Sequence, residues 1–292
     1  MVKTISDLYL DARRVLLTQE TPQDASLMAR NLLCHITGMT QEQVLSQRDK
    51  YVNDSVCQQM EAAVQRLLNG EPLPYVLGKW EFYGLDLIVT PDVLIPRDDT
   101  CAVAALAIQQ SLFLDTKPRI LDLCTGSGCI GLAIASRVKD AKVTLADLSQ
   151  EALAVAKQNI VLHHLTSRVS CVRVNALEAP PAFLGKFDLI VSNPPYITTR
   201  DMLELPHSVA GFEPRMALHG GDDGLKFYRS IASQYAAVLK PGGYLCFEFG
   251  DDQGDDVCAI LEENGYTILE RAKDYHDRER AVIARYDRKE DE

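Results

Sequence analysis

The fold is decided by one stretch of the chain, Phe187-Asp188-Leu189-Ile190-Val191-Ser192-Asn193-Pro194-Pro195-Tyr196. Its first part is an apolar run of strand length, which is typical of a strand buried in a parallel sheet. Two consecutive prolines cannot continue a central strand, so the strand is predicted to end at Ser192 or Asn193. Asn193 is therefore expected at the carboxyl end of a strand, where open α/β sheets carry their binding and catalytic residues.

The residues that follow this strand suit the methylation of a planar nitrogen. The lone pair of an amide or aromatic amine is delocalised, so acceptors must draw its hydrogens aside before the nitrogen can attack a methyl group. The Asn193 side-chain oxygen and the Pro194 carbonyl can accept those hydrogen bonds, and Tyr196 can stack on the planar group. The alternative is a plain turn after a strand, since Asn-Pro often begins turns.

An alternation of strands and helices surrounds this stretch and predicts an α/β domain. A long loop is predicted over 197–223, and loops of this length in a compact domain are usually functional or mobile. Strands are predicted over 119–123, 142–146, 169–174, 187–192, 244–249, 266–271 and 280–286, and helices over 100–112, 129–137, 149–164, 225–239 and 254–263. The last two strands have no helix between them, so they should pair antiparallel.

A glycine-rich turn over 122–131 joins the first predicted strand to its helix, and Asp147 ends the second strand. The glycines allow the backbone to approach a ligand, and an acidic residue at that position suits a ribose diol. The spacing also satisfies the dinucleotide fingerprint, so a nicotinamide or flavin enzyme is the first competing interpretation. Asp122 would repel a pyrophosphate but could hold the ammonium of S-adenosyl-L-methionine, which together with Asn193 favours methyl transfer.

Composition and charge narrow the function classes. The chain has 292 residues, which allows two domains, and its net charge of −11 argues against a large nucleic-acid-binding surface. None of its eight cysteines forms a Cys-x-x-Cys pair and the histidines show no metal spacing, so we expect no metal site. We also expect no signal peptide and no membrane span, and therefore a cytoplasmic protein.

The chain before residue 74 is predicted to be a small helical bundle. Helices are expected from about Ile5, over 22–37, and after capping boxes that begin at Thr40 and Ser55. Such a bundle is either a packing domain or a docking surface for a macromolecular substrate. A β-hairpin linker is predicted over 74–97, where Arg97 is either an anion contact or a surface charge, and the catalytic domain over 98–292.

At this point the chain resembles the HemK/PrmC-type peptide chain release factor glutamine methyltransferases. The resemblance covers nearly all of the catalytic part and the linker and is vaguer over the N-terminal helices. Asn-Pro-Pro-Tyr is shared with adenine-N6 methyltransferases, so the linker hairpin followed by Ile95-Pro96-Arg97 is the more specific sign. The matching stretches are 72–78, 81–84, 94–97, 122–130, 190–197 and 277–280.

The resemblance implies a class I, Rossmann-like, seven-stranded methyltransferase domain that follows a small N-terminal helical bundle and a β-hairpin linker. It implies N5-methylation of the glutamine side chain in the Gly-Gly-Gln motif of class I peptide chain release factors. The cofactor would be S-adenosyl-L-methionine and the product S-adenosyl-L-homocysteine. No metal, membrane or direct nucleic-acid partner is expected, and the chain is expected to be a monomer.

The resemblance also assigns residues to the site. Catalysis would fall to Asn193, Pro194 and Tyr196, and the substrate glutamine would be held by Asn193, Pro194, Pro195 and Tyr196. The cofactor would be bound by Asp122, Cys124, Thr125, Gly126, Ser127, Gly128, Asp147, Asn175, Ala176 and Asn193, with Asp147 on the ribose hydroxyls and Asn175 and Ala176 beside adenine.

The sequence departs from the family at two places. Asp98-Asp99-Thr100-Cys101 stands where the family tends to have Pro-Glu-Thr-Glu, and Asn175 stands where an acidic residue is usual beside adenine. Two other functions stay open as alternatives. One is an adenine-N6 nucleic-acid methyltransferase that uses the same Asn-Pro-Pro-Tyr on a flipped base, and the other is a cofactor-binding module of translation without activity.

Overall fold

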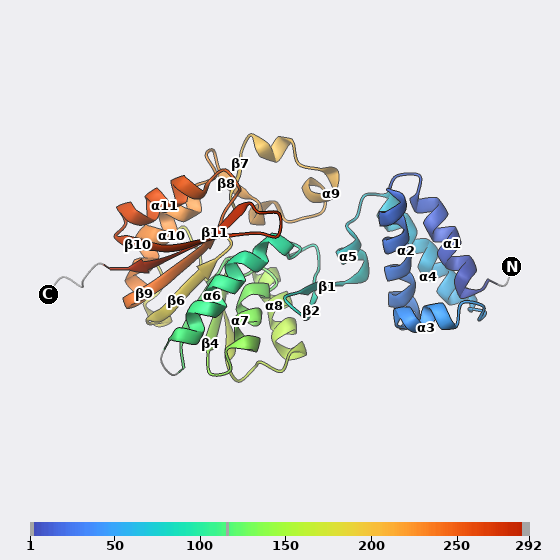
Figure 1. Cartoon of the computed structure of the whole chain (residues 1–292), viewed down its shortest axis with the longest axis horizontal. Helices are drawn as coiled ribbons and strands as arrows, with labels where there is room; N and C mark the ends of the chain where they lie inside the picture. The colour runs from blue at the N-terminus through green and yellow to red at the C-terminus, as the bar shows by residue number, and fades with distance from the viewer. Residues whose placement is uncertain (1–2, 115–116, 288–292) are drawn as a thin grey trace. The chain divides into compact units, whose positions relative to one another are not determined.

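A computed structural model describes residues 3–114 and 117–287 of the chain (Figure 1). Its contacts divide the chain into two units, one of Met1–Gly78 with His207–Phe212 and one of Lys79–Pro206 with Glu213–Glu292. The division into a bundle over 1–73, a linker over 74–97 and a catalytic domain over 98–292 stays a prediction. Among the described residues, no helix is both long enough and apolar enough to cross a membrane.

The first unit is a helical bundle. The five helices that the structure describes before Gly78 each bury apolar side chains, such as Leu8, Leu32, Leu33 and Met60. The helices are α1 (Ile5–Leu16), α2 (Pro22–Thr37), α3 (Gln41–Ser46), α4 (Asp54–Leu68) and α5 (Leu73–Leu77), and a further short helix, α9 (His207–Ala210), falls in the returning segment.

Side-chain caps set the helix starts in this unit. The capping box predicted at Thr40 is present, with the Thr40 hydroxyl accepting from the Gln43 N–H at 3.2 Å. The capping box predicted at Ser55 is wrong, because the start of helix α4 lies two residues earlier. Its N-cap is Asn53, whose Oδ1 accepts from the Val56 N–H at 2.9 Å, and the extended backbone of Asn53 suits that role.

The second unit is built around a seven-stranded sheet with the strand order β10-β11-β9-β6-β3-β4-β5. Parallel pairing joins the five strands from β9 to β5 in this order, while β11 pairs antiparallel with both β9 and β10. This confirms the antiparallel prediction for the last two strands. The strands are β3 (Arg119–Leu123), β4 (Lys142–Asp147), β5 (Val169–Arg173), β6 (Phe187–Ser192), β9 (Leu239–Glu248), β10 (Tyr266–Lys273) and β11 (Glu279–Tyr286).

Helices cover both faces of this sheet (Figure 1). Side chains alternate between two cores along each strand, so Ile120 packs among one set of helices and Leu121 among the other. The first core lies under α6 (Cys101–Phe113), α7 (Cys129–Arg137) and α8 (Gln150–Leu162), and the second under α10 (Lys226–Gln234) and α11 (Gly254–Glu263). This is the predicted α/β class with its mostly parallel seven-stranded sheet.

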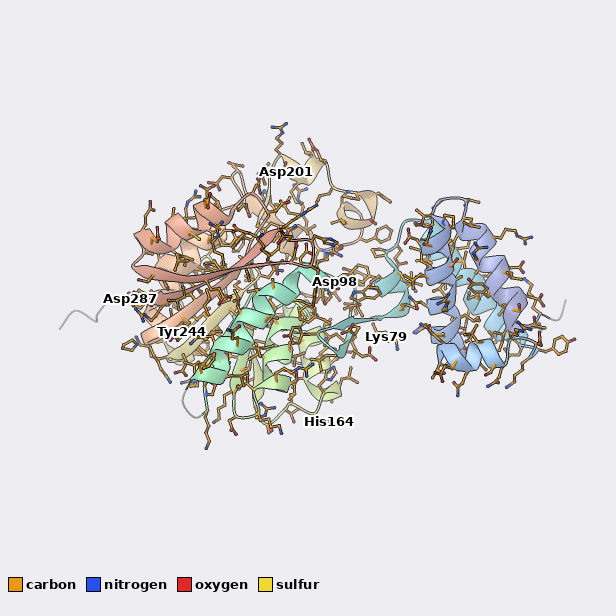
Figure 2. All side chains as sticks on the ribbon, in the orientation of Figure 1. Lys79, Asp98, His164, Asp201, Tyr244 and Asp287 are labelled. Atoms are coloured by element: carbon orange, nitrogen blue, oxygen red, sulfur yellow. The ribbon has the colours of Figure 1, made fainter. Side chains whose placement is uncertain are left out.

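A hairpin precedes the sheet, as predicted. Strands β1 (Lys79–Phe82) and β2 (Leu85–Ile88) pair antiparallel, and Tyr83 and Gly84 between them both have positive φ, of 53° and 81°. Two central residues with positive φ match the twist of the strands they join. The 3₁₀ turn Asp98–Thr100 then leads into α6, and Figure 2 labels Asp98, the first residue of this turn.

Two boundaries after the long loop differ from the prediction. The helix predicted over 225–239 ends at Gln234 and continues only as a 3₁₀ turn, Tyr235–Val238. Strand β9 begins at Leu239 and not at Tyr244, so Lys240-Pro241-Gly242-Gly243 lies within the strand. The pairing of β9 with β6 jumps from Leu239 to Tyr244, and this irregularity absorbs the proline and glycines.

Candidate active site

One pocket lies at the carboxyl ends of the parallel strands in the second unit. Because β3 pairs with β4 and β6, the residues that follow these strands meet at one edge of the sheet. The cavity at this edge has a volume of about 120 Å³. Seven of the predicted site residues line it, namely Cys124, Gly126, Asp147, Asn175, Ala176, Asn193 and Pro195.

The other predicted residues lie outside the pocket lining. Thr125 and Ser127 are buried residues of the glycine loop itself, and Gly128 caps α7. The Tyr196 ring packs against the core under α10 and α11, and its burial raises the pKa of the phenol. Asp122 and Pro194 are buried and do not line the pocket. Their predicted roles toward cofactor and substrate stay predictions.

The glycine loop is held in a fixed shape by backbone bonds. Cys124 adopts a left-handed conformation with a φ of 61°, and the Thr125 N–H donates to the Ala146 carbonyl at 3.1 Å. Gly131 brings α7 close to the sheet, since a Cβ there would lie 2.2 Å from Leu145 Cδ2. Only glycine permits this approach, so the loop can reach over the sheet edge into the pocket.

Asp122 supports this loop from below. Its Oδ2 accepts from the Thr125 hydroxyl at 2.6 Å and from the Gly131 N–H at 2.9 Å, while its buried Oδ1 has no hydrogen-bond partner. Complete burial raises the pKa of Asp122 to about 7, against the opposing effect of the two hydrogen bonds. An unpartnered carboxylate oxygen is a group that a cation, directly or through water, would satisfy.

Asp147 faces the pocket from the end of β4. Its Oδ2 accepts from the Gly126 N–H at 2.9 Å and its Oδ1 from the Ser149 N–H at 3.0 Å. Burial raises the pKa of Asp147, and these backbone donors oppose the shift. A carboxylate offers about four lone-pair sites, so each oxygen can accept one further hydrogen bond. This geometry fits the two hydroxyls of a ribose.

The wall expected beside adenine is apolar. Asn175 and Ala176 both line the pocket, but the Asn175 side chain is engaged locally. Its Oδ1 accepts from the Leu177 N–H at 3.0 Å and its Nδ2 donates to Glu178 at 2.8 Å. The Asn175 amide therefore shapes the turn, and a flat ring would meet neighbours such as Val174 and Ala176.

Asn193 and its neighbours are braced from several sides. The Ser192 hydroxyl donates to the Leu123 carbonyl at 2.6 Å, and Gln253 donates to the Tyr196 carbonyl at 3.1 Å. Gly220 packs directly on this backbone, since a Cβ there would lie 2.7 Å from both the Pro195 oxygen and Tyr196 Cα. Gly220 belongs to β8 (His219–Gly221), which pairs with β7 (Ile197–Thr198).

The sequence did not reveal two segments that complete the pocket wall. Residues 92–94 come from the linker, and Pro214, Met216 and Ala217 come from the long loop. Glu213 ties these segments together, because its buried carboxylate pairs with Arg97 and accepts from the Ile95 N–H at 3.2 Å. Arg97, left open above as an anion contact or a surface charge, has this structural ion pair. The length of the loop was the only sequence signal.

A buried acidic residue next to Asn193 was also missed. Glu248, the last residue of β9, is 1% exposed, and its Oε2 has no hydrogen-bond partner. Burial raises the pKa of Glu248 to about 8, opposed by hydrogen bonds from the Thr100 and Asn193 side chains. An acidic residue at the end of an apolar strand is the signal that identified Asp147 and could have identified Glu248. Asp99, at the departure from the family pattern, pairs with Arg280 at 3.4 Å.

Nothing in the described ranges suggests a metal centre, because no three His, Cys, Asp or Glu side chains there are grouped so that they could hold an ion.

Two family models match the chain. The model described as "Methyltransferase small domain" matches residues 100–207, which contain the glycine loop and Asn-Pro-Pro-Tyr. The model described as "PrmC N-terminal domain" matches residues 8–78, which form most of the helical bundle.

Curated relatives match over nearly the full length. A release factor glutamine methyltransferase from Clostridium acetobutylicum is 36% identical over 282 residues, covering 97% of this chain and 93% of that protein. The protein of the same name from Geobacter sulfurreducens is 37% identical over 276 residues, covering 94% and 95%. Among solved structures, a methyltransferase from Pyrococcus furiosus has a TM-score of 0.50 at 19% identity and covers 77% of this chain and 98% of that one. That likeness concerns the fold.

Proposed function

Because the chain belongs to the release factor glutamine methyltransferase family, we propose that it methylates the glutamine side chain in the Gly-Gly-Gln motif of class I peptide chain release factors. The observation that carries the proposal is that the Asp147 carboxylate and the Asn193 amide line the same pocket. One group suits a cofactor ribose and the other suits a substrate amide.

The pocket residues fit S-adenosyl-L-methionine, whose sulfonium supplies an activated methyl group when it is bound. Asp147 would accept hydrogen bonds from the ribose hydroxyls, and Val174 and Ala176 would lie against adenine. The glycine loop would cover the methionine part, and Asp122 beneath it would favour the positive charge of the ammonium.

The reaction needs positioning and electrostatic stabilisation more than acid–base machinery. The glutamine nitrogen forms a bond to the methyl carbon as the carbon–sulfur bond breaks and its electron pair stays on sulfur. The nitrogen then loses one proton, which leaves N5-methylglutamine and S-adenosyl-L-homocysteine. Asn193 Oδ1 and the Pro194 carbonyl would accept hydrogen bonds from the amide as it becomes positive.

The helical unit is the natural source of substrate specificity. A single glutamine side chain is too small to distinguish one protein from another, so binding energy must come from contacts remote from the reacting nitrogen. The loop that follows Asn-Pro-Pro-Tyr contributes His207–Phe212 to the helical unit, so the chain itself links the two parts. The reaction would take place in the cytoplasm, which is consistent with eight free cysteines.

The test is transfer of labelled methyl groups from S-adenosyl-L-methionine to a purified class I release factor. We expect one methyl group on the Gly-Gly-Gln glutamine and no label on the matched factor that carries alanine there. Total RNA and DNA are offered in parallel. Label on adenine with none on the release factor would replace the proposal with the nucleic-acid alternative.

A second measurement tests the role of the helical unit. The intact factor should be methylated with a much higher specificity constant than a short Gly-Gly-Gln peptide. Deleting residues 1–73 should remove most of that difference, with cofactor binding of the truncated protein as the control for its folding. If the truncated protein kept the full preference, recognition would lie in the second unit.

A further inference from the structure

A buried polar cluster lies behind Asn193, on the side away from the pocket. It consists of Thr100 at the start of α6, Asn193 after β6 and Glu248 at the end of β9. The register of β6 and β9 pairs Ser192 with Phe247, so Asn193 and Glu248 are the next residues along the two neighbouring strands. Three elements far apart in the sequence therefore meet at one side chain.

The hydrogen bonds in this cluster have a defined direction. Asn193 Nδ2 donates to the Thr100 hydroxyl oxygen at 3.4 Å. The Glu248 carboxyl group, on the next strand, lies close enough to the Asn193 side chain for hydrogen bonding between them to lower the pKa of Glu248 against the effect of burial. A primary amide nitrogen carries two hydrogens, so Thr100 can accept one and Glu248 the other. The Asn193 oxygen is left for the pocket, which Asn193 lines.

Fold stability does not account for a carboxyl group at this position. A buried acidic side chain with one oxygen unpartnered is unfavourable, and an apolar side chain of similar volume is often neutral or stabilising at such places. The residues before it, Cys246 and Phe247, are fully buried apolar side chains. The nearby charges of Asp99 and Arg280 act on Glu248 in opposite directions and pair with each other.

We propose that Glu248, assisted by Thr100, is a positioning residue that holds the Asn193 amide with its oxygen toward the substrate nitrogen. A flipped Asn193 amide would present two N–H donors to the substrate amide, which needs acceptors. The proposal rests on the proposed function for the identity of that nitrogen. Glu248 acts through Asn193 and touches neither cofactor nor substrate.

The first test is a double-mutant cycle on release factor methylation. Glu248→Leu should lower kcat by about tenfold or more, because it leaves the amide free to rotate, with little change in the cofactor Kd. Glu248→Gln keeps an acceptor for Asn193 Nδ2 and should retain most of the activity. In an Asn193→Ala background, Glu248→Leu should have little further effect, because its target is already gone.

The outcomes separate positioning from general stabilisation. Losses that multiply in the double variant, or a Glu248→Gln enzyme as slow as Glu248→Leu, would overturn the proposal. Thr100→Val removes the second acceptor with little change in shape and should show the same pattern more weakly. If Glu248→Leu does not fold, Thr100→Val replaces it in the double-mutant cycle with Asn193→Ala.

The second test needs no substrate. The side-chain amide protons of Asn193, assigned by their absence in Asn193→Ala, should be protected from solvent exchange in the wild-type protein. That protection should persist in Glu248→Gln and fall in Glu248→Leu. If the wild-type enzyme left release factors unmethylated but showed this protection, the proposed function would fail and the role of Glu248 would stand. Unprotected protons in the wild-type protein would overturn the role of Glu248.

Discussion

Asp122 is a carboxyl group that the folded protein holds away from water, so replacing it with asparagine should change how stability depends on pH. Asparagine keeps an oxygen that can accept from Thr125 and Gly131, as Asp122 Oδ2 does. It has no ionised form in this range. The substitution therefore removes the ionisable group at position 122 while it keeps the local hydrogen bonds.

The magnitude follows from the pKa of Asp122 in the two states. The folded value is about 7, and an exposed aspartate in the unfolded chain titrates near 3.9. Between these values the folded state binds more protons than the unfolded state, so the contribution of Asp122 to stability is fully present below pH 4 and is lost as pH rises through 7. The full loss is on the order of 4 kcal/mol, and about 2–3 kcal/mol of it falls between pH 5 and pH 8.

The assay is urea unfolding of the cofactor-free protein, followed by tryptophan fluorescence. Trp80 is the only tryptophan and lies in β1 of the second unit, so its signal reports the unit that contains Asp122. The free energy of unfolding of Asp122→Asn minus that of the wild-type protein should increase by about 2–3 kcal/mol from pH 5 to pH 8. Other groups titrate in both proteins and cancel in this difference.

A difference that stays constant across this pH range would refute the reasoning. It would mean that the pKa of Asp122 in the folded protein is not raised above its ordinary value, and hence that water, a cation or the fold itself stabilises the charge at Oδ1.

The remaining predictions concern the pocket. Asp147→Ala should weaken binding of S-adenosyl-L-methionine at least about tenfold, because charge-assisted hydrogen bonds to the ribose are lost, and unchanged affinity by calorimetry would remove Asp147 from the cofactor site. Asn193→Ala should lower kcat by roughly a hundredfold or more with the fold and most cofactor binding retained, and near-normal turnover would contradict the role given to its oxygen. Gly220→Ala places a Cβ 2.7 Å from the Pro195 oxygen, so it should lower kcat and destabilise the second unit by about 1–3 kcal/mol. A normal rate and melting temperature would show that the backbone around Pro195 can shift without cost.

The parts of the site that follow directly from a strand could be predicted from the sequence. The apolar run before Asn193 marks a buried strand, and a polar residue at its end must lie at the carboxyl edge of a parallel sheet. Asp147 is placed by the same logic. Local pattern and topology are enough in these cases, because the pocket is formed where those strands end.

The rest of the wall depends on contacts that leave no local pattern. Glu213 binds the backbone of Ile95, which is 118 residues earlier in the chain, and nothing around Glu213 in the sequence indicates that partner. For the segment 240–243 the sequence does carry a local signal, but that signal predicts the wrong structure. Its local composition predicts a helix end, but Leu239 and Tyr244 on either side of it both pair with β6, so the segment lies within a strand as an irregularity.

The assignment of His207–Phe212 to the helical unit has a consequence for how the chain is made. That unit is otherwise complete at Gly78, and its last part is encoded about 130 residues later. At roughly 5–20 residues per second, a ribosome needs on the order of 6–26 seconds to synthesise the intervening chain. During this interval the surface at Gly70, against which the His207 ring packs, is uncovered. A fragment that ends at Gly78 would keep that surface exposed permanently, so an isolated helical unit intended for study should carry the segment 207–212 on a tether.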